Sequence, residues 1–519
     1  MVFVLNETVP RSSSSSLKSV ITANFAGTLW QALMGLAFIP LYIKYLGIES
    51  YGLIGIFATL QSIFALLDVG LGDTLTREMA RLSVLPGKEQ ETRDLVRTLE
   101  TIYWTIAVFA GMAVVASSPF IEHHWIKSGN LSPTAIEQAF VIMGFVTIFQ
   151  LPVSFYTGGL IGLQKQVALN LIAACVATLR GAGAILVLHW IPTIQAFFLW
   201  QSAIGAINFV LYARVLWHYL PQSNHRPAFQ LHLIKGVWRF SAGMGGISVL
   251  AVILTQLDKV VLSKMLSLEM FGYYMLASVV AMSLTRIFTP MFFSIYPRFT
   301  QLVSINDQDG LRQLYHKSCQ FMAVLILPVA TVTAFFAYEI ILLWTRNTIT
   351  AEKTHFIVSV MICGTALNGL MNPPYALQLA FAWTRLPFYV NLLSVTLFIP
   401  IIIVVVTAFG AIGGALAWLI LNIGYILFWI PLIHKRILRA EKWRWYWQDG
   451  FLPATTSIIV AGLGRLLTTE SMSSNAMLLS LAAIFVMTFG ITALTTPVTR
   501  TILFAELRKI GFAMSQNEV

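Results

Sequence analysis

The sequence is poor in charged residues, in cysteine and in nucleotide-binding motifs. Only 11% of its 519 residues are charged, whereas soluble domains carry roughly a quarter, and this deficit excludes a large soluble enzyme. The three cysteines, Cys175, Cys319 and Cys363, lie in or at the ends of apolar runs without a pairing pattern, which favours apolar packing over disulfides or a metal site. No glycine-rich loop ends in Gly-Lys-Ser/Thr, which excludes nucleotide hydrolysis by that device. We expect no catalytic residue, metal or cofactor.

What the sequence has instead is long apolar runs. Apolar residues make up 57% of the chain, and runs of about 18–25 residues are long enough to cross a hydrocarbon layer of ~30 Å as helices. The runs predict an all-α polytopic membrane protein with about fourteen transmembrane helices. We expect them at roughly 20–43, 51–69, 99–120, 136–160, 167–190, 194–217, 237–262, 271–296, 319–343, 355–380, 387–409, 411–433, 451–468 and 476–495.

The basic residues predict the orientation of these spans. When the N-terminus is placed in the cytoplasm, most of the 33 Lys and Arg residues fall in cytoplasmic tails and loops. The net charge of +11 then indicates loops facing anionic lipid rather than a nucleic-acid partner. We therefore expect both termini in the cytoplasm and an even number of spans.

The chain contains a long-period internal repeat. Lys44–Gly52 and Lys264–Gly272 share Lys, Leu, an aliphatic residue, Glu, an aromatic residue and Gly at the same spacings, and both form a polar elbow between two apolar runs. Three further pairs recur at nearly the same offset: Pro152 and Pro373, Asn170 and Asn391, Trp200 and Trp418. A repeat of this length in an apolar chain is typical of a two-lobed transporter. We expect two six-helix lobes related by a pseudo-two-fold axis along the membrane normal, plus two extra C-terminal helices.

The repeat predicts a domain organisation. The expected parts are a cytoplasmic tail at 1–19, an N-lobe at 20–217, a cytoplasmic linker at 218–235, a C-lobe at 236–433, a basic and aromatic cytoplasmic segment at 434–450, the two extra helices at 451–495 and a cytoplasmic tail at 496–519.

Arg286 is the strongest candidate for a functional residue. It lies about fifteen residues into its expected span, or ~22 Å along a helix. An arginine facing lipid at that depth costs several kcal/mol, so we expect it to face protein or a water-filled cavity. Its guanidinium suits a phosphate oxyanion, with which it forms bidentate contacts. The alternative is a structural arginine bonded to helix carbonyls or to an acid.

Two other charged residues lie in or beside the N-lobe spans. Asp68 follows the span that pairs with that of Arg286 in the repeat, and we expect it either to pair with Arg286 or to cap the turn that follows. Arg180 lies near the middle of its span beside Gly181 and Gly183, which permit close helix approach. This placement favours interhelical bonding for Arg180 and leaves a cavity role as the alternative.

The remaining candidates are polar residues in or near other spans. Asn24, Gln31 and Gln256 either line the substrate path or form interhelical hydrogen bonds. Asp258 is a candidate for a gate or ion contact, whereas its neighbour Lys259 is expected to point about 100° away from it and to extend toward the surface. Glu339, near the outer end of its span, is a weaker candidate for ion coupling.

Two phrases resemble a known family. Leu67-Asp68-Val69-Gly70-Leu71-Gly72 and Asp258-Lys259…Gly272-Tyr273-Tyr274, together with the two-lobed pattern, are similar to the Wzx-type polysaccharide flippases of the multidrug/oligosaccharidyl-lipid/polysaccharide exporter superfamily. The resemblance implies that an undecaprenyl-pyrophosphate-linked oligosaccharide moves from the cytoplasmic to the outer leaflet of a bacterial inner membrane by alternating access. It implies membrane lipids as surroundings, and a polysaccharide polymerase and a chain-length regulator as partners.

Two other functions remain open from the sequence. A multidrug/cation antiporter of the same superfamily would need a negatively charged N-lobe cavity, for which Asp68 is the one candidate. A membrane glycosyltransferase or polymerase would need a long outer loop with acids or arginines, and the longest expected outer loop is only about fifteen residues, 121–135.

Overall fold

The computed structural model describes residues 27–68, 71–83, 85–468, 472–501 and 504. It divides into two compact units, Met1–Val249 and Leu250–Val519. The regular structure of the described residues is entirely helical. The all-α fold class is therefore confirmed, while Asn24 and the 1–19 tail lie outside the described residues.

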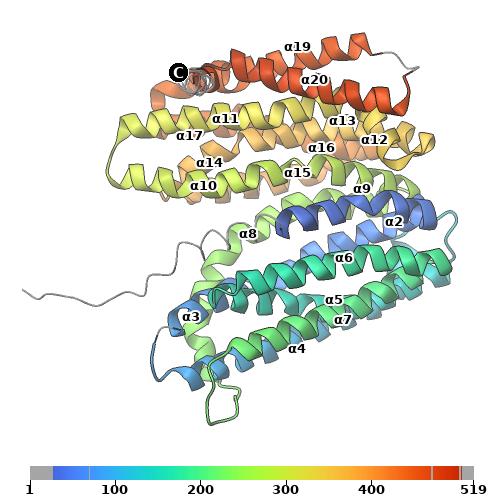
Figure 1. Cartoon of the computed structure of the whole chain (residues 1–519), viewed down its shortest axis with the longest axis vertical. Coiled ribbons are helices and arrows are strands. Elements are labelled where there is room, and N and C mark those ends of the chain that lie inside the picture. The colour runs from blue at the N-terminus through green and yellow to red at the C-terminus, as the bar shows by residue number, and fades with distance from the viewer. Residues whose placement is uncertain (1–26, 69–70, 84, 469–471, 502–503, 505–519) are drawn as a thin grey trace, which may run out of the picture. The chain divides into compact units, whose positions relative to one another are not determined.

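The first unit consists of long helices joined by short connections (Figure 1). Residues 27–37 are helical. They are followed by α2 (Ile39–Phe64), η1 (Ala65–Asp68), α3 (Leu71–Leu82), α4 (Glu89–His124), α5 (Pro133–Gly162), α6 (Gln166–Trp190) and α7 (Ile194–Tyr219), and α8 (Leu231–Met265) continues into the second unit.

The second unit repeats this order of helices and adds two at its end. Its elements are α9 (Leu268–Met282), α10 (Thr285–Ser304), α11 (Gln308–Phe335), α12 (Ala337–Thr345), α13 (Thr348–Leu370), α14 (Asn372–Ala380), α15 (Arg385–Phe409), α16 (Ala411–Gly424), η2 (Tyr425–Trp429), α17 (Ile430–Arg436), η3 (Arg439–Glu441), α18 (Lys442–Arg444), η4 (Trp445–Phe451), α19 (Leu452–Leu467) and α20 (Ser474–Thr495).

The membrane-spanning content agrees with the sequence analysis. Among the described residues, 12 helical segments are long and apolar enough to cross a membrane. The expected span at 237–262 coincides with α8, which is not one of these 12, and the expected span at 20–43 lies partly outside the described residues.

The repeated elbow breaks a helix in both copies, but by different means. In the first copy, Gly47 takes a φ of 81° inside α2, a left-handed conformation that glycine adopts without strain. In the second copy, α8 ends at Met265 and the hydroxyl of Ser267 caps α9 by accepting a hydrogen bond from the Met270 N–H at 3.3 Å. The predicted elbow is therefore present in each unit.

The glutamate that both copies of the elbow contain has different surroundings in each. Glu49 is buried and accepts hydrogen bonds from the backbone N–H groups of Gly129 and Asn130, at 2.6 and 3.0 Å, in the α4–α5 loop. Glu269 is exposed and accepts a hydrogen bond from the Tyr273 hydroxyl at 3.3 Å. Glu49 thus fixes the first elbow to a neighbouring loop, whereas Glu269 bonds to a tyrosine of its own helix.

The first unit is built around α5, which packs against α3, α4, α6 and α7. Its core lies where α4, α5 and α7 meet, and large aromatic side chains fill it, among them Tyr103, Phe155 and Tyr156. The phenol of Tyr156 donates a hydrogen bond to the Glu100 carboxylate at 2.6 Å, so the core is apolar around a few satisfied polar groups.

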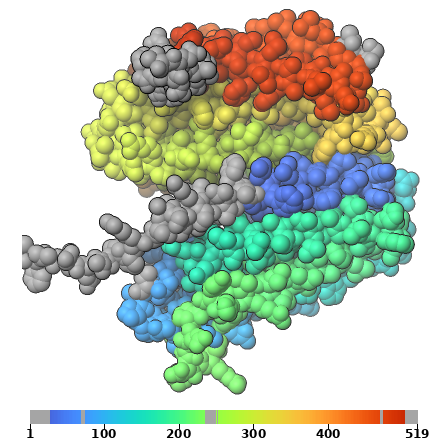
Figure 2. Space-filling model, viewed as in Figure 1, coloured from blue at the N-terminus to red at the C-terminus, as the bar shows by residue number. Residues whose placement is uncertain are grey.

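The second unit is organised around α13, which packs against α9, α11, α12 and α16. The added pair α19–α20 packs on α11, and its surface lies against that of α11 in the space-filling view (Figure 2). A buried polar cluster joins α11 to η3 and η4, the segments that precede α19: His316 lies between the carboxylates of Asp449, at 2.5 Å, and Glu441, at 3.0 Å, and Gln320 donates to Asp449 at 2.8 Å. The added helices and the segments that lead to them therefore pack on the core of this unit.

The linker after α7 is docked onto α4. The backbone N–H groups of Ala228 and Gln230 donate to the side chains of Asp94, at 2.8 Å, and Thr98, at 2.9 Å. The Gln230 amide adds a third bond, to the other carboxylate oxygen of Asp94 at 2.8 Å. Because Asp94 is buried, the linker is held by a satisfied carboxylate rather than lying free.

The glycines beside Arg180 make room for aromatic rings, as their position predicts. A Cβ on Gly183 would lie 2.1 Å from the Trp200 ring of α7, and a Cβ on Gly181 would lie 2.2 Å from the Phe38 ring. Trp200 also donates its indole N–H to the Leu179 carbonyl at 3.1 Å. The contact between α6 and α7 therefore requires a residue without a side chain at 183.

We expect Gly183→Ala to destabilise the first unit by about 1–3 kcal/mol, because the added methyl overpacks the Trp200 ring. Thermal unfolding of the purified protein measures the loss. Gly490→Ala on α20 is the control, since a Cβ there meets no atom within 4 Å. Equal unfolding temperatures for the two variants would contradict the close packing of α6 and α7.

Candidate functional site

A polar cavity lies inside the first unit, around Arg180. Its volume is about 370 Å³, and helix 27–37, α2, α5, α6 and α7 contribute to its wall. The polar groups that line it are Gln31, Tyr42, Arg180, Asn208 and Tyr212. The other lining residues are small or apolar, so the polar groups are concentrated in one place among apolar spans.

Arg180 enters this cavity without a protein partner. It lies near the middle of α6, and its Nε is buried and has no hydrogen-bond partner among the described residues. None of these residues forms an ion pair with its guanidinium, and the Tyr42 phenol lines the same cavity. A guanidinium at membrane depth normally faces a cavity or a countercharge. Here the cavity is present and the countercharge is missing within the described part of the chain.

Asn208 supplies a complementary unpaired group. Its Oδ1 is buried and has no hydrogen-bond partner among the described residues. The amide of Gln31 donates to the Gly27 carbonyl at 3.2 Å, and the Tyr212 hydroxyl donates to the Leu169 carbonyl at 3.3 Å. The cavity thus offers charged donors from Arg180 and a free acceptor from Asn208, which together suit an anionic group that carries hydroxyls.

Arg286 lies elsewhere, in the second unit. The expected span at 271–296 lies within one segment that is long and apolar enough to cross a membrane, Leu268–Ser304. A turn at residues 283–284 divides this segment into α9, which ends at Met282, and α10, which begins at Thr285 with Arg286 as its second residue. Pro290 has no N–H to donate to the carbonyl of Arg286 four residues earlier, so α10 lacks one helical hydrogen bond there. Arg286 is exposed and forms no hydrogen bond or ion pair through its side chain with another described residue. Its assignment to substrate remains a prediction.

Asp68 caps a turn, which is one of its two expected roles. Its Oδ1 accepts a hydrogen bond from the backbone N–H of Gly72 at 2.9 Å and another from the Tyr103 hydroxyl. Both donors belong to the first unit. The carboxylate therefore serves the start of α3, and a contact with Arg286 is not needed to satisfy it.

The expectation for Asp258 and Lys259 is wrong in its geometry. The Lys259 ammonium lies 3.2 Å from Asp258 Oδ1 and donates to the Thr255 carbonyl at 2.8 Å. The long lysine side chain folds back along its own helix, so adjacent positions meet despite the 100° between their Cβ directions. Tyr274 of α9 donates to Asp258 Oδ2 at 2.5 Å. Both charged residues are buried, and they form a closed cluster rather than an open ion site.

The other candidates are spread over both units. Gln31 lines the Arg180 cavity, and Gln256 is half-buried on α8. Glu339 lies on α12 in an ion pair with Arg465 of α19 and faces a second, larger cavity. Of the predicted site residues, Arg180 and Gln31 therefore line one cavity in the first unit. Glu339 belongs to the second unit.

The other polar residues that complete the Arg180 cavity were not predicted from the sequence. Asn208 is one of three amides in the apolar run 194–217, with Gln195 and Gln201, and its signal was as strong as that of Gln31. Tyr42 and Tyr212 resemble ordinary aromatic residues near span ends, so their sequence positions contain no comparable signal.

Comparisons with known proteins agree with the two-lobed pattern. The family described as "Polysaccharide biosynthesis protein" matches residues 17–303. The lipopolysaccharide biosynthesis protein WzxC of Escherichia coli K12 is 24% identical over 472 residues, which cover 85% of this chain and 88% of that protein.

Solved structures show the same fold. The lipid II flippase MurJ in an inward closed conformation superposes with a TM-score of 0.69 at 15% identity, covering 94% of this chain and 99% of that one. An inward-facing multidrug resistance transporter of the MATE family, in the MOP superfamily, gives a TM-score of 0.63 at 14% identity, covering 79% and 96%.

We expect Asp258→Leu to destabilise the second unit by about 3–5 kcal/mol, because it leaves the buried Lys259 ammonium without its countercharge. The double variant Asp258→Leu/Lys259→Met should recover most of that loss, since an apolar pair of similar volume needs no countercharge. Thermal unfolding of the two variants measures the difference. A double variant that is less stable than the single one would contradict the pairing.

Proposed function

Since the chain belongs to the polysaccharide biosynthesis protein family, we propose that it is a transporter that moves a lipid-linked oligosaccharide across the bacterial cytoplasmic membrane. Both termini lie in the cytoplasm, as the distribution of basic residues predicts. The relative WzxC is named for lipopolysaccharide biosynthesis, and MurJ is named as a flippase of a lipid-linked sugar. The flipped product passes to a polymerase and a chain-length regulator that assemble the surface polysaccharide.

The observation that supports this proposal most directly is the unpaired guanidinium of Arg180. Placing an arginine at the centre of a span costs about 2.5–3.5 kcal/mol even on the most lenient scale. Arg180 has no countercharge among the described residues, so its cost is offset when a ligand supplies the anion. The pyrophosphate of an undecaprenyl carrier is such an anion, and it accepts bidentate hydrogen bonds from a guanidinium.

The neighbouring groups suit the rest of the headgroup. Asn208 Oδ1 accepts a hydrogen bond from a sugar hydroxyl next to the phosphate, and Gln31 lies on the same wall. A cavity of about 370 Å³ is near the lower end of the range of ligand sites. It therefore holds the phosphates and the first part of the headgroup rather than a complete oligosaccharide. Alternating access would open this site in turn to the two sides of the membrane.

The charge of the cavity favours a lipid-linked anion over a cationic drug. Arg180 is the one charged residue among those that line it, and Asp68, which a cation antiporter would use, is satisfied by Gly72 and Tyr103. A positive charge in the site raises the cost of binding a cation. We therefore assign anionic headgroups, and not cations, to this cavity.

We expect Arg180→Ala to abolish export of surface polysaccharide, because the headgroup loses its countercharge, and Arg180→Lys to retain part of it. Export in a strain that lacks the chromosomal copy of the gene is measured by surface polysaccharide staining, with membrane insertion checked by immunoblot. Arg214→Ala, an exposed arginine on α7 outside the cavity, is the matched control. Normal export by the inserted Arg180→Ala variant would refute the role of Arg180.

Arg286 provides a second test, because its exposed side chain forms no hydrogen bond or ion pair with another described residue and is available to an anionic substrate. We expect Arg286→Ala to reduce export at least tenfold without loss of insertion, in the same staining assay. Arg298→Ala is the control on α10, where the guanidinium donates to the Gln301 side chain at 2.9 Å. If both variants export normally, Arg286 has no part in transport.

A further inference from the structure

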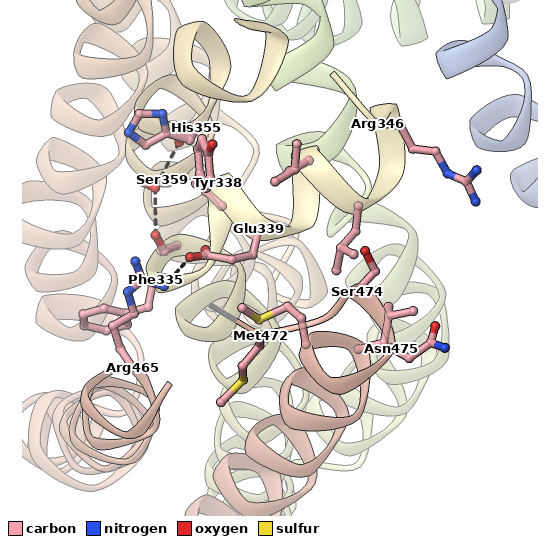
Figure 3. A pocket seen from close by; sticks show the side chains of 16 residues that line it. Phe335, Tyr338, Glu339, Arg346, His355, Ser359, Arg465, Met472, Ser474 and Asn475 are labelled. Atoms are coloured by element: carbon pink, nitrogen blue, oxygen red, sulfur yellow. Dashed lines mark hydrogen bonds and ion pairs between the residues drawn. The ribbon is translucent and has the colours of Figure 1, made fainter. Parts of the chain in front are cut away.

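A second cavity lies in the second unit, away from Arg180 (Figure 3). Its volume is about 1040 Å³, and its wall is formed by α12 and α13 together with the added helices α19 and α20. The distribution of basic residues places this end of the unit at the outer face of the membrane. The cavity is large enough for a ligand of several hundred daltons, such as a disaccharide.

The central polar group of this cavity is the Glu339 carboxylate. Glu339 is only 8% exposed, and its Oε1 forms an ion pair with the Arg465 guanidinium. Its other oxygen, Oε2, is buried and has no hydrogen-bond partner among the described residues. A buried carboxylate oxygen without a donor is costly unless a ligand or water supplies one. Figure 3 shows the Glu339 carboxylate next to Arg465, to which a dashed line joins it.

Arg465 is held in place from the other side. Its guanidinium lies over the Phe336 ring, 5.5 Å from the ring centroid. The ion pair and this stacking contact hold the guanidinium at Oε1, and Glu339 Oε2 receives no donor from the described residues. The pair is therefore nearly neutral as a unit, with one buried carboxylate oxygen that lacks a donor.

His355 and Tyr338 form a second polar wall. The His355 Nδ1 lies 3.1 and 2.9 Å from the carbonyl oxygens of Ala351 and Glu352, which requires Nδ1 to carry the proton. In the neutral ring, Nε2 is then an acceptor. The rings of His355 and Tyr338 meet edge to face at 5.9 Å, so the Tyr338 hydroxyl and a flat apolar surface lie beside each other.

These groups discriminate between classes of ligand. A metal cation at Glu339 would meet the positive charge of Arg465 in the same ion pair, and an anion at Arg465 would meet the carboxylate. A neutral polyol meets neither penalty, because its hydroxyls donate to Glu339 Oε2 and His355 Nε2 and accept from the Arg465 guanidinium. Its C–H face packs on aromatic rings such as Tyr338.

We propose that this cavity binds neutral sugar residues of the transported oligosaccharide, with Glu339 as the residue that accepts their hydroxyls. The inference rests on the proposed function, since the sugars belong to the substrate assigned there, and it concerns the second unit alone. The cavity would receive the oligosaccharide as it reaches the outer side. Glu339 and Arg465 join the core helices to the added pair α19–α20, so sugar binding gives this added pair a role in transport.

The test is saturation-transfer NMR on the full-length protein in a phosphocholine detergent, because maltoside detergents carry a sugar that would compete. The probes are methyl glycosides of glucose, galactose, rhamnose and N-acetylglucosamine. We expect saturation transfer to at least one of them, with affinity at least tenfold weaker in Glu339→Gln. Glu352→Gln, a neighbouring exposed carboxylate outside the cavity, should bind as the unchanged protein does.

Tyr338→Phe keeps the test decisive if Glu339→Gln does not fold, because it removes one hydroxyl and leaves the ring and the ion pair. It should weaken the same probe severalfold. Absence of saturation transfer to every probe, or equal affinity in the folded variants, would overturn the proposal. Competition by sodium or inorganic phosphate at millimolar concentration would also overturn it, since the occupant would then be an ion. The free glycosides carry no phosphate for Arg180 to bind. Their binding can therefore fail or succeed whether or not the Arg180→Ala variant exports polysaccharide.

Discussion

The cost of a charged group within an apolar span constrains the whole structure. A charge at that depth must meet an opposite charge, a hydrogen-bonding group or a ligand. Asp258 meets Lys259 at 3.2 Å, and Glu339 meets Arg465. Arg180 alone among these enters a cavity without a countercharge from the described residues. The proposed account of transport depends on this difference, because an anionic substrate would supply the countercharge that the described residues do not.

The fold could be predicted from the sequence as far as it depends on the length of the apolar runs and on the internal repeat. The two elbows at Gly47 and Ser267 follow from matching residues, and each breaks a helix where the repeat indicates. The turn before Arg286, inside a single candidate span, was missed, because an apolar run does not show where a helix is interrupted. The docking of the linker on Asp94 was also missed, since a hydrogen bond between distant segments has no local signal.

The candidate site could be predicted only in part. Arg180 was recognisable as a charge within an apolar run, but its lack of a partner depends on the side chains that α2 and α7 bring near it. The pairing of Asp258 with Lys259 was missed because adjacent helical positions point about 100° apart. The lysine side chain is long enough to fold back and reach the carboxylate despite that angle. Glu339 and Asn208 were visible in the sequence as polar residues near or within apolar runs. That one oxygen of each lacks a partner among the described residues was not, because this arises from packing between separate helices.

The central claim is that Arg180 binds the anionic part of a lipid-linked sugar. Native mass spectrometry of the purified protein with added undecaprenyl pyrophosphate tests this claim most directly. The account predicts that the unchanged protein retains the lipid and that Arg180→Ala loses it, while Arg214→Ala retains it. Equal retention of the lipid by Arg180→Ala and the unchanged protein would contradict the account.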